Sequence, residues 1–192
     1  EIDCGLFAAK SIVGEIFEIE ADIFCDGHDA ISADLLFRRN TERDFQRKPF
    51  VFISNDRWKA SCVFDKPATY FFSLEAWIDC FKTWQADFLK KCGAKQVIDV
   101  DALIGSQIIS EASEEAIDND KSMLEHFALL IQKTSDPAHA AMIASNQDLT
   151  LLMRRYGSHS FVQRYERELE VSVDRSKARF STWYELFVRS AS

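Results

Sequence analysis

Acidic side chains are the most numerous chemically active groups in this chain, with 31 Asp and Glu among 192 residues. Two carboxylates facing each other across a cleft could do acid–base chemistry of the glycosidase type, provided that one has a raised pKa. The acids in the predicted strands instead recur at every second residue, which places them on the polar face of a sheet. We therefore interpret them as a solvated face and expect no catalytic pair. These acids are Glu18, Glu20, Asp22, Glu166, Glu168 and Glu170.

Motifs for other chemistries are missing from the sequence. Six scattered glycines form neither a nucleophile elbow nor a phosphate-binding loop. The five cysteines include no C-x-x-C, and neither they nor the four histidines offer the close ligand pairs of a zinc site. His28 follows Gly27 in a predicted turn, and we interpret it as a loop residue. We therefore expect no catalytic, cofactor-binding or metal-binding residue and no cofactor. The residues considered are Cys4, Cys25, Cys62, Cys80, Cys92, His28, His126, His139 and His159.

Two tryptophans, Trp77 and Trp183, alternate out of phase with the inward-facing residues of their predicted strands. Exposed aromatic rings on a sheet could stack on sugar rings, or a neighbouring domain could cover them. A helical segment is predicted directly after Trp77, which favours coverage. Sugar binding stays open as the alternative.

Charge and hydropathy exclude two classes of partner. The formal net charge is −8 and the basic residues form no stripe longer than a short pair, so a nucleic-acid backbone would be repelled. No apolar run approaches the roughly 20 residues that span a bilayer, and no leader segment is apparent. We expect a cytoplasmic protein with free cysteines, no nucleic-acid partner and no membrane partner.

The stretch from Gly14 to Cys25 has the clearest periodicity. Five small or apolar residues alternate with the acids, which is typical of a half-buried strand and would scatter around a helix. Asp26 to Asp29 supplies a turn, in which Gly27 suits a positive φ. Alternation then resumes from Ile31 to Arg38, so we expect a hairpin. The inward-facing residues of the first strand are Phe17, Ile19, Ala21, Ile23 and Cys25.

Further strands are predicted downstream, before and after a helical segment. Asn40 to Lys48 is charged and is expected to be a loop or a frayed edge. From Phe81 to Gly157 apolar residues recur every three or four positions, as in a small antiparallel helical bundle. Ser113 and the pair Asp136-Pro137 are expected helix starts, and Gly93 and Gly157 expected ends. The additional strands are expected at Phe50–Ser54, Trp58–Phe64, Thr69–Asp79, Tyr165–Asp174 and Ala178–Leu186.

Seven short strands interrupted once by helices predict the fold class. They are typical of an immunoglobulin-like β-sandwich of antiparallel sheets, here with an inserted small α-helical bundle. A terminal two-strand hairpin would be marginally stable alone, so its strands should return to the first sheets. We therefore expect a β-sandwich N-terminal domain formed by residues 1–80 and 161–192, and an inserted helical domain at residues 81–160.

Several motifs are similar to those of a known family. The chain resembles the N-terminal region of α-1,4-glucan:maltose-1-phosphate maltosyltransferases, including the segment that leads into their catalytic barrel. Val188 stands where the family usually has proline. The motifs that carry the resemblance are Gly14-Glu15, Glu18–Asp29, Asn55–Trp58, Glu75–Asp79, Thr83-Trp84, Tyr165–Arg167 and Arg179–Phe187.

The resemblance implies a function for the whole enzyme and a supporting one for this chain. Members belong to the α-amylase superfamily and use a retaining mechanism on a (β/α)8 barrel, which would follow Ser192 here. The aspartate and glutamate motifs of that barrel do not occur in this sequence. The resemblance therefore implies an inactive accessory and dimerisation region, partnered by the catalytic barrel and a second subunit. The alternative is an α-glucan-binding module that uses exposed aromatic residues.

Overall fold

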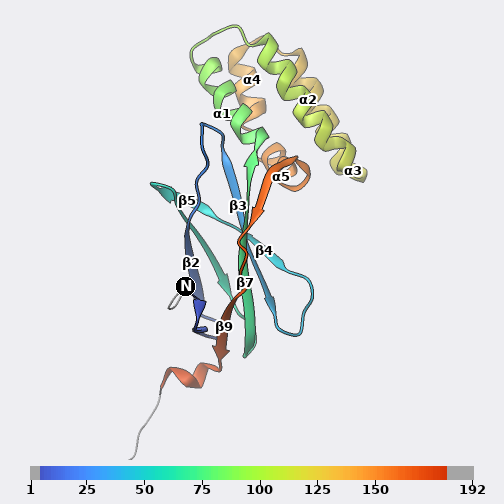
Figure 1. Ribbon diagram of the computed structural model, residues 1–192. Helices are drawn as coiled ribbons and strands as arrows, with labels where there is room; N and C mark the ends of the chain where they lie inside the picture. Colours follow the sequence, from blue (N-terminus) through green and yellow to red (C-terminus); the bar gives the residue numbers. More distant parts are fainter. Residues whose placement is uncertain (1–4, 181–192) are drawn as a thin grey trace, which may run out of the picture. The chain divides into compact units, whose positions relative to one another are not determined.

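The computed structural model describes residues 5–180 and shows a mixed α/β chain. Strands come first, five helices follow, and two strands and a short 3-10 helix close the described part (Figure 1). Two compact units are present. Among the described residues, the strand unit comprises 5–23, Asp34–Glu75 and 164–180, and the helical unit comprises Phe24–Ala33 and Ala76–Gln163.

The larger sheet has six strands in the order β1-β9-β7-β3-β4, and β8 also pairs with β7. β1 runs parallel to β9, whereas β7 is antiparallel to β9 and β3 is antiparallel to β4. The strands are β1 (Ala9–Ile12), β3 (Ile31–Arg39), β4 (Gln46–Pro49), β7 (Ala68–Asp79), β8 (His159–Arg164) and β9 (Leu169–Asp174).

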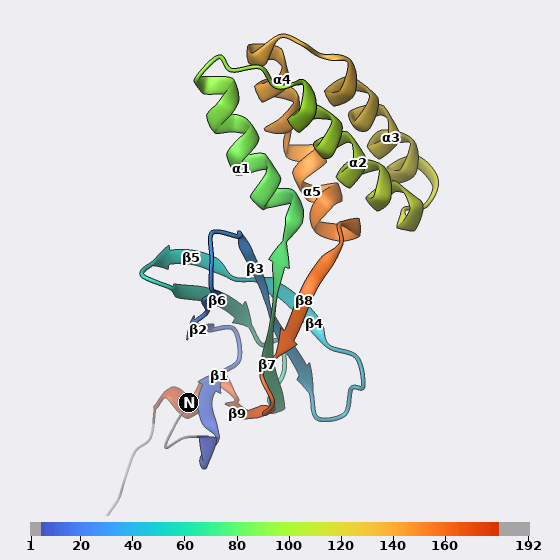
Figure 2. The same cartoon turned by 45° about the horizontal axis from the view of Figure 1, so that its top comes forward.

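The second sheet is antiparallel, in the order β2-β6-β5 (Figure 2). It consists of β2 (Ile16–Asp22), β6 (Arg57–Val63) and β5 (Val51–Ser54). The alternation predicted for the first strand is confirmed, because exposed and half-buried residues alternate along β2. Phe17 of β2 lies 6.0 Å from Phe72 of β7 between ring centroids, so the two sheets contact each other through aromatic side chains.

The predicted hairpin between the first two strands is wrong. β2 pairs with β6, and β3 pairs with β4 in the other sheet. Burial explains the error: the polar positions Ser32 and Asp34, like the apolar ones between and after them, are buried in β3. A strand that is buried on both faces is typical of the interior of a sheet, and β3 lies between β7 and β4. The alternation of polar and apolar residues in its sequence had suggested a strand with one exposed face.

The remaining strand predictions are mixed. The strands near Phe50–Ser54, Trp58–Phe64 and Thr69–Asp79 are confirmed, whereas β1 and β8 were missed. These two are short and lack a regular apolar period. β4 is an edge strand in the segment that was predicted to be a loop or a frayed edge. The expected last strand is wrong at its start, because Ser176–Arg179 is a 3-10 helix. The rest of it, with Tyr184 and Leu186, lies outside the described residues.

The predicted helical bundle is confirmed as five helices. The carboxylate of Asp136 caps the fourth helix by accepting hydrogen bonds from the backbone N–H groups of Ala138 and His139. Ser113 is not a helix start: it is buried within a helix, and its hydroxyl donates to the carbonyl of Ser110 at 2.6 Å. The helices are α1 (Cys80–Gly93), α2 (Asp99–Glu115), α3 (Asp118–Lys133), α4 (Pro137–Ala144) and α5 (Gln147–Tyr156).

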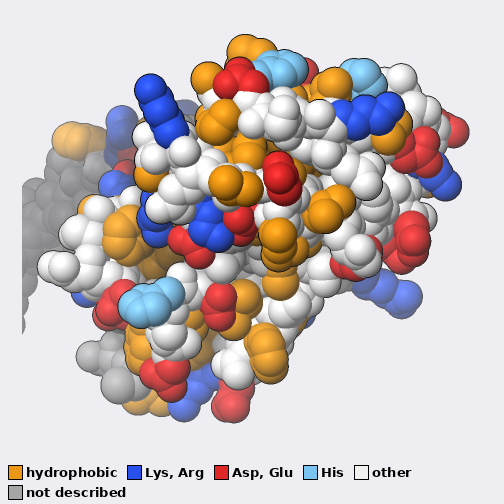
Figure 3. Space-filling model, turned by 90° about the horizontal axis from the view of Figure 1, so that it is seen from above, with side chains coloured by type: hydrophobic (Ala, Val, Ile, Leu, Met, Phe, Trp, Pro, Cys, Tyr) orange, Lys and Arg blue, Asp and Glu red, His pale blue; other side chains and the backbone are white. Residues whose placement is uncertain are grey.

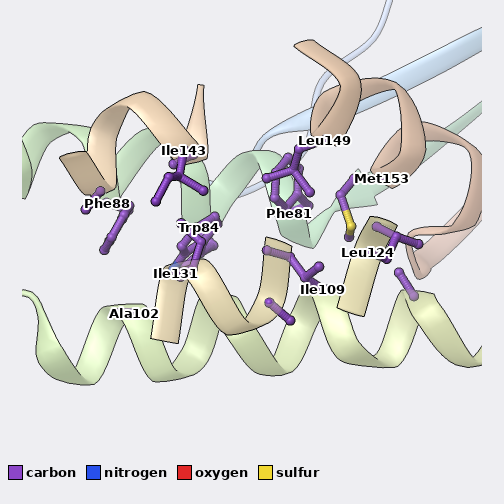
Figure 4. Close-up of a cluster of buried hydrophobic side chains, with 14 of the residues drawn as sticks. Phe81, Trp84, Phe88, Ala102, Ile109, Leu124, Ile131, Ile143, Leu149 and Met153 are labelled. Carbon is purple, nitrogen blue, oxygen red and sulfur yellow. The ribbon is translucent and has the colours of Figure 1, made fainter. Parts of the chain in front are cut away.

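The helical unit has its own apolar core, to which all five helices contribute (Figure 4). Trp84 stacks on Phe88 with a centroid distance of 4.8 Å, and α2 crosses closely over the Trp84 ring at Gly105. Within residues 5–180, no helix is both long enough and apolar enough to cross a membrane. The labelled core residues are Phe81, Trp84, Phe88, Ala102, Ile109, Leu124, Ile131, Ile143, Leu149 and Met153.

Candidate interaction surfaces

The acids of β2 lie on its exposed face and form a ladder of ion pairs with β6. Arg57 contacts Glu20 at 3.3 Å and Asp22 at 2.8 Å, and Lys59 contacts Glu18 at 2.6 Å. Asp22 lies directly opposite Arg57 in the register, whereas the Glu20–Arg57 and Glu18–Lys59 pairs are diagonal contacts between the two strands. Such exposed pairs contribute up to about 1 kcal/mol each, and nothing in this arrangement desolvates a carboxylate.

The acids near β9 are also distributed over a surface. Glu168 forms ion pairs with Arg38 at 2.7 Å and with Arg164 at 3.3 Å. The guanidinium of Arg38 also lies over the ring of Phe71, 5.3 Å from its centroid. Glu166 and Glu170 are exposed, so the structure does not bring these three acids together in a cleft.

His28 is exposed in the bend after β2, next to Gly27, whose φ of +107° confirms the expected positive dihedral. Trp77 is 4% exposed, and its ring stacks on His159 with a centroid distance of 4.1 Å. The prediction that Trp77 is covered is therefore confirmed, and its ring offers no open platform for a sugar. Trp183 lies outside the described residues.

A cavity of about 270 Å³ adjoins Trp77 within the helical unit. Its wall combines apolar side chains with Asp79, Glu111 and Arg154. Asp79 is engaged with the start of α1, where its carboxylate accepts a hydrogen bond from the Lys82 backbone at 2.9 Å. Cys80 Sγ lies 3.5 Å from Ser160 Oγ, so the neighbour of this thiol is a neutral hydroxyl.

Four cysteines in the described part of the chain are free: Cys25, Cys62, Cys80 and Cys92. Burial raises the pKa of the Cys62 thiol to about 11, and burial also raises the pKa of Cys92. A thiol with a raised pKa is a poor nucleophile and a poor metal ligand at neutral pH. Residues 5–180 contain no group of three or more His, Cys, Asp or Glu placed to hold a metal ion.

Exposed apolar residues gather at two places that the sequence analysis did not identify. The α2 stripe consists of Val97, two residues before α2, and of Val100, Leu103 and Ile104 near its beginning. The β5 edge consists of Val51, Phe52 and Ile53. Figure 3, a view from above relative to Figure 1, shows on that face hydrophobic side chains between acidic and basic ones, with Lys and Arg dispersed rather than in a stripe. These surfaces are suited to protein contacts rather than to catalysis.

Comparison with known proteins identifies the family. A family profile described as "Alpha-1,4-glucan:maltose-1-phosphate maltosyltransferase, domain N/S" matches residues 1–175. The chain belongs to this domain N/S family. An alpha-1,4-glucan:maltose-1-phosphate maltosyltransferase of Chlorobaculum tepidum is 38% identical over 192 residues, covering 100% of this chain and 28% of that protein. Enzymes of the same name from Myxococcus xanthus and Cereibacter sphaeroides are 33% and 34% identical, covering 100% of this chain and 30% and 32% of those proteins.

The resemblance inferred from the motifs is thereby confirmed over most of the chain. The domain N/S chain spans less than a third of the length of these curated relatives. Family membership gives the exposed apolar surfaces a context, because the relatives contain much more polypeptide than this chain.

Proposed function

We propose that this chain is the non-catalytic domain N/S of a retaining maltosyltransferase that transfers maltosyl units from maltose 1-phosphate to α-1,4-glucans. The observation that carries the proposal is the family match over residues 1–175, together with relatives named for this activity. The site geometry supports the accessory role, since the acids considered at the outset are ion-paired or exposed on surfaces. The catalytic groups would belong to the part of the enzyme outside domain N/S.

We also propose a domain assignment within this chain. Residues 1–80 and 161–192 would form an immunoglobulin-like β-sandwich, and residues 81–160 an inserted helical domain. Aromatic contact between the two sheets and a separate apolar core in the helical unit support this division. The parallel pairing of β1 with β9 is a departure from a purely antiparallel sandwich.

The proposed work of domain N/S is positional. It would bind the catalytic barrel of the same polypeptide and a second subunit, and so hold the active-site loops of the enzyme in place. The α2 stripe supports a protein partner, because Val97 is 82% exposed and Val100 is 69% exposed on the surface of an otherwise well-packed bundle. The free cysteines agree with the proposed cytoplasmic location.

Activity measurements test this proposal directly. The isolated 192-residue chain should release no phosphate from maltose 1-phosphate and elongate no glucan, whereas the full-length enzyme should do both. Release of phosphate by the isolated chain would contradict the accessory role, and a full-length enzyme inactive with maltose 1-phosphate would contradict the proposed reaction. Sedimentation equilibrium of the isolated chain would show whether domain N/S associates with a second copy without the barrel.

A further inference from the structure

β5, which contains the β5 edge, is an exposed apolar strand at the end of the three-stranded sheet. β5 pairs with β6 on one side, and no strand lies beyond it in the described sheet order β2-β6-β5. All four of its residues are exposed, with Val51 at 66% and Phe52 at 55%. From Phe50 to Asn55 the sequence contains no charged side chain. Backbone groups on the outer side of such a strand are free to pair with another chain segment.

The other outer strands of the two sheets are protected against such pairing. Natural proteins protect edge strands with charged side chains, above all Lys, and with Pro. Each of β1, β2, β4 and β8 contains at least one charged residue, and β4 also ends in Pro49. The unprotected β5 edge therefore stands apart from its counterparts in the same protein. The charged residues are Lys10 in β1, Glu18, Glu20 and Asp22 in β2, Arg47 and Lys48 in β4, and Arg164 in β8.

We propose that an extended segment of the same polypeptide, from outside domain N/S, pairs with the outer side of β5 in the full-length enzyme. The inference rests on the proposed function, which makes this chain one part of a longer enzyme. Relatives offer ample chain for this, because domain N/S accounts for 28–32% of their length. Backbone hydrogen bonds to the open edge would provide the pairing, and apolar side chains next to Val51 and Ile53 would cover the exposed surface.

A second copy of the chain is a poorer occupant. Specific interfaces between separate proteins bury roughly 1,200–2,000 Å². β5 has four residues, with an irregularity between Phe52 and Ser54, and the neighbouring outer face of β6 is occupied by the ion-paired Arg57 and Lys59. The apolar area is therefore small and bounded by charge. Within one polypeptide the effective concentration is on the order of millimolar, so that a small contact can persist.

Amide hydrogen exchange of residues 51–54 tests the proposal. We expect exchange to be at least about tenfold slower in the full-length enzyme than in the isolated chain, because an added strand engages amides that are open in domain N/S alone. The β2 amides should exchange equally in both proteins, which provides an internal control. Equal exchange at residues 51–54 would overturn the proposal. The proposal would also be overturned if exchange at residues 51–54 of the isolated chain slowed as the chain concentration increased, because a second copy of the chain would then be pairing with β5.

A pair of matched variants makes the test specific. Val51→Lys places a charge on the β5 edge, and Ile16→Lys places one on β2, where the native side chain is 69% exposed. Both variants should unfold like wild type as isolated chains, because both native side chains are largely exposed. In the full-length enzyme only Val51→Lys should return exchange at residues 52–54 to the rate of the isolated chain. Identical rates for the two variants would overturn the proposal.

Activity is read separately in the same samples. If the wild-type enzyme transfers maltosyl units while its β5 amides stay unprotected, the pairing is wrong and the proposed function stands. If the β5 amides are protected while maltose 1-phosphate is not used, the pairing stands and the proposed reaction is wrong. The two proposals can therefore fail independently.

Discussion

The hydroxyl of Ser32 donates a hydrogen bond to Oδ2 of Asp79 over 2.8 Å. The other carboxylate oxygen, Oδ1, accepts from the backbone N–H of Lys82 at 2.9 Å, so Asp79 caps the first turn of α1. Nζ of Lys82 also donates to the Ser32 hydroxyl at 2.7 Å. One carboxylate thus connects the beginning of β3 to the beginning of the helical bundle, at the residue where β7 ends.

Replacement of Asp79 should therefore destabilise the helical unit. Asp79→Ala removes the cap and should lower the free energy of unfolding by about 1–2 kcal/mol, measured by urea denaturation. Asp79→Asn keeps an oxygen for the Lys82 N–H and should cost less. Ser32→Ala serves as the control for the hydrogen bond to β3. Equal losses for Asp79→Ala and Asp79→Asn would show that charge, rather than capping, carries the effect.

Gly105 should tolerate no side chain. A Cβ atom at this position would lie 2.0 Å from Cζ2 of Trp84, whose ring is packed in the bundle core. Gly105→Ala should therefore lower the free energy of unfolding by about 1–3 kcal/mol through overpacking, although Ala is the better helix former. Gly93→Ala is the matched control, because nothing lies within 4 Å of a Cβ there. Thermal unfolding of both variants gives the comparison, and equal midpoints would contradict the close packing of α1 and α2.

Sequence periodicity predicted most elements but few of their partners. The alternation from Phe17 to Asp22 reports which face is buried, and β2 confirms it, yet the same alternation in β3 suggested a hairpin that does not form. Pairing depends on contacts between residues far apart in sequence, such as Ile16 with Val63, which a local pattern does not contain. Ser113 shows the same limit for helices, because a serine followed by acids suits a cap and equally the last turn of α2.

For the candidate surfaces, the sequence predicted some features, such as the coverage of Trp77, but not others, such as the exposure of β5. Coverage of Trp77 could be inferred because the helical period begins four residues later, at Phe81, but its partner His159 lies 82 positions away in the sequence. The β5 edge was predicted as a strand, but its exposure was not, because a short apolar run is equally typical of a buried strand. Only the sheet order shows that β5 has an open side.

Cys62 should be nearly inert toward alkylating reagents. Its burial raises the pKa to about 11, so at pH 8 roughly one molecule in a thousand carries the reactive thiolate. Cys25 is half-buried and more accessible. Iodoacetamide labelling at about pH 8, followed by mass spectrometry of the peptides, should modify Cys25 well before Cys62. Rapid modification of Cys62 in the native protein, at a rate insensitive to urea, would contradict its burial.

Glu42 should contribute to the acid sensitivity of the strand unit. Hydrogen bonds from the side chain and then the backbone of Arg39 lower the pKa of Glu42 below its ordinary value of 4.5. Because the folded pKa is lower than the unfolded one, this stabilisation is present above about pH 4.5 and is lost as the pH falls through the folded pKa. Glu42→Gln should be less stable than wild type near neutral pH, and the difference should shrink on acidification. Urea denaturation at several pH values measures it, and a constant difference would contradict the coupling.

Glucan binding through Trp77 should be absent. The ring is 4% exposed and stacked on His159, so a soluble α-1,4-glucan cannot reach its face without displacing the imidazole. Titration of the isolated chain with maltoheptaose should therefore give no saturable quenching of tryptophan fluorescence that is lost on Trp77→Phe. His159→Ala uncovers one face of the ring and tests whether access alone creates a sugar platform, and Trp183→Phe removes the other tryptophan considered for this role. One outcome would contradict this prediction: saturable quenching in wild type that persists in Trp183→Phe and is lost in Trp77→Phe. Trp77 would then be accessible in solution, and the glucan-binding alternative would replace the purely positional role.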